Sequence, residues 1–342
     1  MLLRPHQRLF LGLGISGLLL WAVFRNVDPA RMMLHVRTAK PGYVALFVAA
    51  LTVSHGCRVL RWDVLTRPFA HVPTLVLLRV CCVGLMLMFV LPFRLGELAR
   101  PVLLKRACGA PITSTLGAVA VERTLDGLCI SGLFFVATLT TGYVVPRFLW
   151  IAACGALAIF ATTATAIGLA LVGGNALENL LWRWGRTRWG RTMAPNVTAK
   201  VVVLLRTFVA GLRALPQGRH VAAMLVLTGV YWGITGLGWA ALLRAFAWNI
   251  PLQGALVVMC VVVIGVMVPA GPGFLGTFQG AVHVALSLFG LGANAGAAVA
   301  TVAYPAIALV AVGFGLPFAF SLSLSDPKND LSMQPARRRH RP

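Results

Sequence analysis

The stretch PLQGALVVMCVVVIGVMVPA, residues 251–270, contains no charged side chain in twenty positions. An α-helix rises about 1.5 Å per residue, so a run of this length covers the roughly 30 Å hydrocarbon core of a bilayer. Further apolar runs lie on both sides of it, at about 9–24, 42–57, 74–93, 124–145, 148–173, 220–243, 274–291 and 295–322. The pattern predicts an all-α, polytopic integral membrane protein with about 6–9 membrane segments.

The composition of the whole chain supports the same class. Its 342 residues are 59% hydrophobic and 11% charged, with a mean hydropathy of +0.86, whereas soluble domains average about 25% charged residues. The 30 Lys and Arg residues greatly outnumber the 8 Asp and Glu residues, and they lie mainly between the apolar runs. This distribution is typical of the positive-inside bias and of contact with anionic lipid. We therefore expect a membrane environment and no nucleic-acid partner.

The sequence divides into one long membrane domain and a short tail. We expect a transmembrane domain at 1–324, with a first half at about 42–173, a basic interfacial loop at 174–219 and a second half at about 220–324. The tail at 325–342 is rich in arginine and is expected to be disordered. Because the loop and the tail are basic, both should lie on the cytoplasmic side of the membrane.

Two topologies satisfy this expectation. In the first, residues 74–111 and 251–291 form re-entrant hairpins, the six other runs cross the membrane, and the amino terminus is cytoplasmic. In the second, every run crosses and the amino terminus lies on the opposite side. The distribution of basic residues favours neither topology.

The two interrupted regions resemble each other. Their Ala-Val-Ala runs at 118–120 and 298–300 are 180 residues apart, and the prolines at 92 and 269 are 177 residues apart. Chance similarity is the alternative in a chain so rich in Ala, Gly and Val. Broken segments at matching positions of two halves indicate a transporter-type binding site, and hairpins from opposite sides would make the repeat inverted. The residues expected to break the helices are Pro92, Gly96, Pro269, Gly271, Pro272, Gly273 and Gly276.

Six charged residues are concentrated near the first interruption. A charge at membrane depth costs roughly 2.5–3.5 kcal/mol or more, so such residues pair with one another or line a wet cavity. Three acids and three arginines can balance as one network. Two interpretations remain open: an ion-pair network that only fastens helices, and a headgroup cavity in which an arginine fork binds an anionic lipid. The six candidate residues are Arg94, Glu97, Arg100, Glu122, Arg123 and Asp126.

No catalytic, metal or cofactor site is expected from the sequence. The carboxylates near 94–126 alternate with arginines, and the seven cysteines contain no C-x-x-C spacing. No serine–histidine–acid arrangement, phosphate-binding loop or dinucleotide-binding turn occurs in a suitable setting. We therefore expect a protein that is not an enzyme and that uses no cofactor.

The motifs together resemble the lysylphosphatidylglycerol synthetase transmembrane-region family, whose members are also described as flippase-like domain proteins. The resemblance covers about Leu9 to Leu322 and implies binding or translocation of a phospholipid or lipid-linked anionic substrate in the bacterial cytoplasmic membrane. The alternative is a non-transporting lipid-binding subunit that supports a partner lipid- or glycan-modifying enzyme. The matching motifs are Leu91-Pro92-x-Arg94-x-Gly96-Glu97-x-x-Arg100, Glu122-Arg123-x-x-Asp126 and Pro269-x-x-Pro272-Gly273-x-x-Gly276.

The chain also departs from the family pattern. Synthetase members carry a cytosolic aminoacyl-transferring domain after this region, which we expect this protein to lack. Members often have glycine where Phe274 stands, glutamate where Gln279 stands, and arginine where Pro305 follows Tyr304. The resemblance therefore does not extend to a mechanism that needs charges on both gates.

Overall fold

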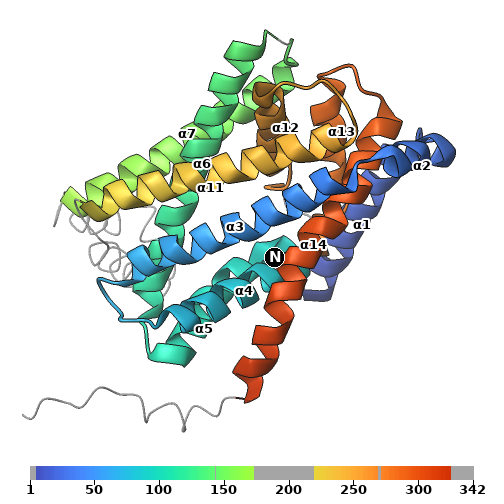
Figure 1. Cartoon of the computed structure of the whole chain (residues 1–342). Helices are drawn as coiled ribbons and strands as arrows, with labels where there is room; N and C mark the ends of the chain where they lie inside the picture. The colour runs from blue at the N-terminus through green and yellow to red at the C-terminus, as the bar shows by residue number, and fades with distance from the viewer. Residues whose placement is uncertain (1–4, 143, 173–218, 269–270, 325–342) are drawn as a thin grey trace, which may run out of the picture.

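The regular structure of the chain is helical throughout the part that the structure describes (Figure 1). The computed structural model describes residues 5–142, 144–172, 219–268 and 271–324, so the predicted tail and nearly all of the predicted basic loop lie outside it. The prediction of an all-α protein is confirmed. The elements are α1 (Pro5–Phe24), α2 (Pro29–Thr38), α3 (Pro41–Thr66), α4 (Thr74–Val90), the 3-10 helix η1 (Pro92–Leu98), α5 (Ala99–Cys108), α6 (Ile112–Thr141), α7 (Arg147–Val172), α11 (Arg219–Ala245), α12 (Leu252–Gly265), the 3-10 helix η2 (Pro272–Phe274), α13 (Thr277–Ser287) and α14 (Ala293–Leu324).

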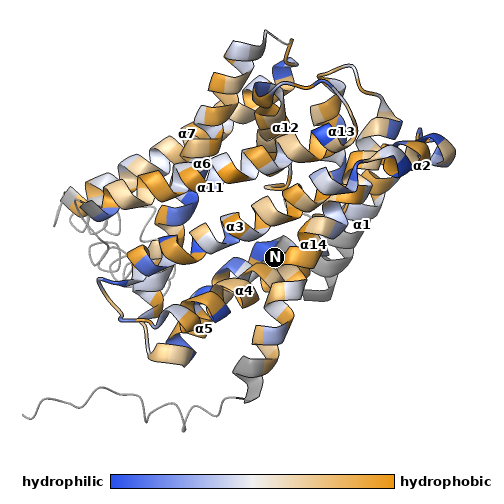
Figure 2. Cartoon of the chain, in the orientation of Figure 1, coloured by the Kyte–Doolittle hydropathy of each residue, from blue (hydrophilic) through white to orange (hydrophobic). Residues whose placement is uncertain are grey.

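Several helices are built to cross a bilayer. Among the described helices, α3, α7, α11 and α14 are long and apolar enough to do so, and their surfaces are predominantly hydrophobic (Figure 2). Helix α6 is equally long at 30 residues, but it carries charged side chains. The chain is therefore a multi-pass membrane protein.

The connections between helices gather at two opposite ends of the bundle. At the first, called the Phe69 end, Phe69 packs near Ala110, Ala118 and Met224. At the second, called the Trp248 end, the Trp248 ring lies 5.9 Å from the His35 ring. There the backbone N–H of residue 40 also donates to the carbonyl of residue 245 over 2.9 Å. Helices α3 and α11 run antiparallel between these two ends.

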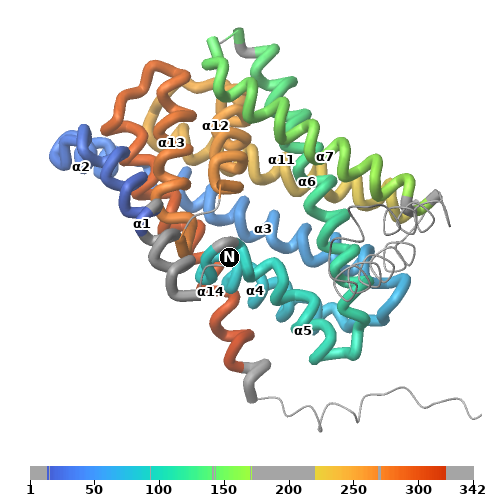
Figure 3. The backbone as a smooth tube through the Cα atoms, turned by 180° about the vertical axis from the view of Figure 1, so that it is seen from behind, coloured from blue at the N-terminus to red at the C-terminus, as the bar shows by residue number. Residues whose placement is uncertain are grey.

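Two broken hairpins reach into the bundle from these opposite ends (Figure 3). In the first, α5 returns along α4, which places Arg100 against Gly84. In the second, α13 returns along α12, which places Ala281 against Gly265. The hairpin tips meet, because Arg94 of η1 donates from Nη2 to the Val266 carbonyl over 3.0 Å. Two hairpins that approach from opposite ends form the inverted arrangement of the first predicted topology.

The proline of the second hairpin that corresponds to Pro92 is not the one predicted from the sequence. The 3-10 turns begin at residues 92 and 272, and the non-glycine residues with left-handed backbone at the two tips are Arg94 (φ 54) and Phe274 (φ 57). Residues 92 and 272, like 94 and 274, are 180 apart. Pro92 thus corresponds to Pro272 and not to Pro269, because proline fixes φ and fits the first position of a helical turn. The Ala-Val-Ala runs have the same spacing of 180.

The predicted second apolar run, 42–57, is too short. Helix α3 continues to Thr66, eight residues beyond Arg58, and it buries Arg61 with 0% of the residue exposed. The charges that ended the apolar run in the sequence do not end the helix, because they find partners inside the bundle. These partners form the candidate site.

Gly96 offers a test of the first hairpin. A Cβ atom at this position would overlap the backbone of Leu87 and Met88, so Gly96→Ala should destabilise the protein by about 1–3 kcal/mol or more. The control is Gly132→Ala in α6, where an added Cβ meets nothing within 4 Å. Thermal unfolding in detergent should show a lower midpoint for the first variant only. Equal midpoints would contradict the close packing of α4 against η1.

Candidate functional site

The six predicted charged residues lie together in one ion-pair network. Arg100 Nη1 lies 2.8 Å from Glu122 Oε2. Arg123 Nη2 lies 2.9 Å from Asp126 Oδ2 and 3.2 Å from Glu122 Oε2. Glu97 joins the network at longer range, with its Oε1 3.7 Å from Arg94 Nη1 and 3.8 Å from Arg123 Nη1. The carboxylate of Glu122 is at the centre and is fully buried.

Helix α3 supplies partners that sequence reasoning missed. Arg61 Nη1 lies 2.8 Å from Asp126 Oδ1, and the indole N–H of Trp62 donates to Glu122 Oε2 over 3.2 Å. From α11, the indole N–H of Trp232 donates to Asp126 Oδ1 over 3.1 Å. The available signal was the helical spacing of positions 54, 58, 61 and 65, which share one face of α3.

The six predicted residues balance as three acids and three arginines, but helix α3 adds two further positive charges, those of Arg58 and Arg61. Three carboxylates, those of Glu97, Glu122 and Asp126, stand beside four paired arginines, and α3 adds a fifth, Arg58. The charged groups described in this region therefore carry a surplus of two positive charges. An uncompensated charge at membrane depth is costly, so the surplus calls for an anion.

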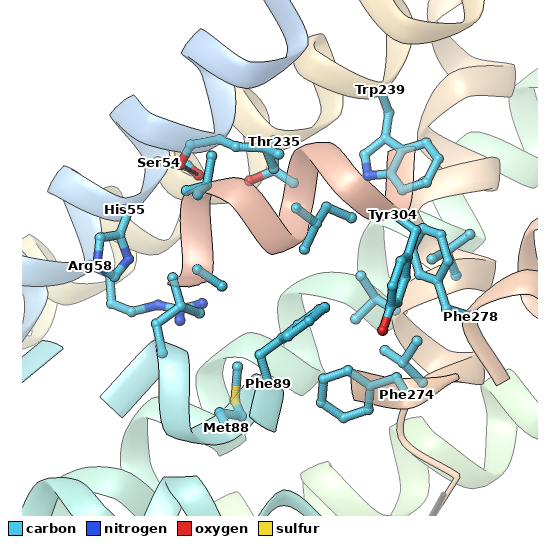
Figure 4. A pocket seen from close by; sticks show the side chains of 18 of the residues that line it. Ser54, His55, Arg58, Met88, Phe89, Thr235, Trp239, Phe274, Phe278 and Tyr304 are labelled. Atoms are coloured by element: carbon cyan, nitrogen blue, oxygen red, sulfur yellow. Dashed lines mark hydrogen bonds between the residues drawn. The ribbon is translucent and has the colours of Figure 1, made fainter. Parts of the chain in front are cut away.

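A cavity of about 210 Å³ lies beside the network, between the hairpin tips and helices α3, α11 and α14. Its two ends differ in chemistry (Figure 4). The polar end is formed by α3 and α11 through Ser54, His55, Arg58, Tyr231 and Thr235. The aromatic end is formed by Phe89, Trp239, Phe274, Phe278 and Tyr304. Such a division suits an amphiphile with a charged head and an apolar body.

The predicted site residues lie beside this cavity and not on its wall. None of the six charged residues lines it, and of the predicted helix-breaking residues that the structure describes only Gly273 does. The reason is that the charged side chains pair with one another between α3, η1, α5 and α6. Their predicted part in lipid binding stays a prediction.

Arg58 is the cation of the cavity. Only 7% of it is exposed, its Nη2 donates to the Tyr231 hydroxyl over 2.5 Å, and its guanidinium lies 5.2 Å from the centre of the Tyr231 ring. Its Nε and Nη1 find no hydrogen-bond partner among the described residues. Nearby, His55 Nε2 lies 3.5 Å from Cys82 Sγ. The wall of the polar end therefore contains a charged group with buried, unsatisfied donors.

The aromatic end is closed where the hairpin tips meet. The Arg94 guanidinium lies 5.3 Å from the centre of the Phe274 ring, and Phe89 contacts both Phe274 and Tyr304, at ring distances of 6.4 and 5.4 Å. Phe274 has φ 57, a conformation that costs an L-residue roughly 1–2 kcal/mol. An aromatic ring therefore occupies a backbone position that suits glycine.

At the tip of the second hairpin, the start of α13 is capped by an uncharged side chain. The Gln279 side chain accepts a hydrogen bond from the Gly276 N–H over 2.7 Å at the start of α13. An amide oxygen can satisfy an orphan N–H at a helix start as a carboxylate does. The only charged group that the described residues place at this tip is Arg94, from the other hairpin.

Comparison with known proteins identifies one family. The model of the family described as the lysylphosphatidylglycerol synthase TM region matches residues 9–315. No curated protein and no solved structure matches the chain.

Proposed function

The chain belongs to the lysylphosphatidylglycerol synthase transmembrane-region family, and we propose that it binds an anionic phospholipid or lipid-linked headgroup in its central cavity and translocates it across the membrane. The family links the chain to lipid handling. The proposal adds the site and the action: the headgroup binds at Arg58, and the lipid moves without chemical change.

The observation that carries the proposal is the buried guanidinium of Arg58, two of whose nitrogens lack a hydrogen-bond partner among the described residues. A buried arginine with unsatisfied N–H donors can give charge-assisted hydrogen bonds to the oxygens of a phosphate or carboxylate. Such an anion would also offset part of the positive surplus that the network leaves. The aromatic end of the cavity gives the adjoining glycerol backbone and acyl carbons an apolar surface.

The two hairpins support translocation as well as binding. Each enters from a different end, and their tips meet at the cavity through the contacts of Arg94 and Phe274. A site at the meeting point of two inverted, broken segments is the arrangement expected for alternating access. Separation of the tips on one side and then the other would open the cavity to each end in turn.

We also propose that the Phe69 end faces the cytoplasm of the bacterial inner membrane. The connection 173–218, which carries seven basic residues, joins α7 to α11 at this end. The described basic residues at the Trp248 end are Arg25, Arg31, Arg37, Lys40, Arg147 and Arg244. The greater density of basic residues at the Phe69 end follows the positive-inside rule.

Translocation can be measured with the purified protein in liposomes. Fluorescent phosphatidylglycerol in the outer leaflet is quenched by dithionite, and we expect protein-containing vesicles to expose the inner-leaflet pool faster than protein-free vesicles do. Vesicles in which the protein binds the lipid but does not move it would instead support the second candidate, a lipid-presenting subunit for a lipid- or glycan-modifying enzyme.

A further inference from the structure

The cavity also indicates which class of headgroup it accepts, an inference that rests on the proposed function. We propose that it takes phospholipids whose headgroup is a phosphodiester bearing neutral hydroxyl groups, and that it disfavours headgroups bearing an ammonium group. The selection follows from where the structure places its carboxylates and how it orients its hydroxyl groups.

Among the described residues that line the cavity, Arg58 is the only one with a formal charge, and none is an acid. None of the three nearby carboxylates is on the cavity wall, and each pairs with an arginine. Glu122 is held by Arg100 and the Trp62 indole, and Asp126 by Arg61 and the Trp232 indole. An ammonium group in the cavity would have no carboxylate to pair with and would lie near the Arg58 guanidinium. Both effects disfavour a cationic or zwitterionic headgroup.

The hydroxyl groups of the polar end have defined hydrogen-bond roles. Ser54 donates to the Leu51 carbonyl over 2.9 Å, and Thr235 donates to the Tyr231 carbonyl over 2.8 Å. Because their hydrogens are engaged, these two oxygens are left as acceptors for the ligand. The Tyr231 oxygen accepts from Arg58, so its own hydrogen is left to donate. Arg58 and Tyr231 thus match phosphate oxygens, while Ser54 and Thr235 match neutral headgroup hydroxyls.

The aromatic end does not provide an alternative site for an ammonium group. Aromatic faces can bind such cations, but here the rings pack against one another: Phe278 lies 5.7 Å from Tyr304 and 6.4 Å from Trp239. Phe274 already has the Arg94 guanidinium near its ring. This end is therefore suited to the uncharged part of a lipid.

The test compares lipid binding by the full-length protein in detergent. Phosphatidylglycerol, phosphatidylethanolamine and lysyl-phosphatidylglycerol with identical acyl chains are titrated, and retained lipid is counted by native mass spectrometry. All three lipids carry the phosphodiester, so the comparison isolates the ammonium group, and an ammonium group without a carboxylate partner should make the two amine-bearing lipids bind roughly tenfold or more weakly than phosphatidylglycerol. Soluble glycerol 3-phosphate should bind much more weakly than the lipid, because it leaves the aromatic end empty.

Three variants test where the preference for phosphatidylglycerol arises. Arg58→Gln should remove it, whereas Arg244→Gln, at an exposed position of the Trp248 end, should leave it intact. Thr235→Asp, which adds a carboxylate beside the cavity, should raise the relative affinity for phosphatidylethanolamine. Equal or tighter binding of the amine-bearing lipids by the unaltered protein would overturn the headgroup inference alone. Binding of no lipid, or of glycerol 3-phosphate as tightly as lipid, would overturn the proposed function as well.

Discussion

Replacement of Glu122 by glutamine is expected to destabilise the protein by about 3–5 kcal/mol, the usual cost of breaking a buried charge pair. Glu122 is fully buried and pairs with Arg100 and Arg123. Its loss would raise the positive surplus of the region from two charges to three. Denaturant titration in detergent, followed by tryptophan fluorescence, should therefore show a large fall in the midpoint.

Two controls show whether the effect comes from the charge balance. The double variant Glu122→Leu with Arg100→Leu keeps the surplus at two, so it should recover most of the lost stability, since replacing a whole buried pair is often nearly neutral. Asp63→Asn breaks the pair with Arg67, which is largely exposed, and should cost well under about 1 kcal/mol. A Glu122→Gln variant as stable as the parent would contradict the network as described.

The sequence was sufficient to predict the helical membrane class and the two broken hairpins. Uncharged runs of membrane length and clustered Pro and Gly residues arise from local requirements, namely burial of backbone groups in lipid and interruption of a helix. The association of Arg94, Glu97, Arg100, Glu122, Arg123 and Asp126 was also predictable, because charges in apolar surroundings must find one another. Helix α2 was missed, although Asp28 caps it and Pro29 occupies its first turn.

The cavity could not be predicted, because its wall depends on how distant helices pack. Arg58 and Tyr231 are 173 positions apart in the sequence, and no local pattern relates them. The uncharged run ends at residue 57, so hydropathy alone does not indicate that Arg58 and Arg61 belong to the same membrane helix. In the structure the helix continues through both, and the network and the cavity are built on that extension.

The second large effect is expected at Arg58, where a substitution should lower lipid translocation without lowering the stability of the protein. Arg58→Gln lowers the positive surplus from two charges to one, so the variant should unfold at the same or a higher denaturant concentration than the parent. Lipid translocation should nevertheless fall by roughly ten- to a hundredfold, since a charge-assisted contact contributes about 1.5–3 kcal/mol. Arg58→Lys keeps the charge but loses the planar fork, and should retain part of the activity.

The most direct test of the account is therefore phosphatidylglycerol translocation by Arg58→Gln and Arg244→Gln, measured side by side in liposomes at equal protein content. Both variants should be folded, which the denaturant midpoint verifies in the same preparations. We predict that Arg244→Gln translocates lipid like the parent and that Arg58→Gln is slower by at least about tenfold. A well-folded Arg58→Gln protein that translocates lipid at the parent rate would contradict the role of the cavity as the headgroup site.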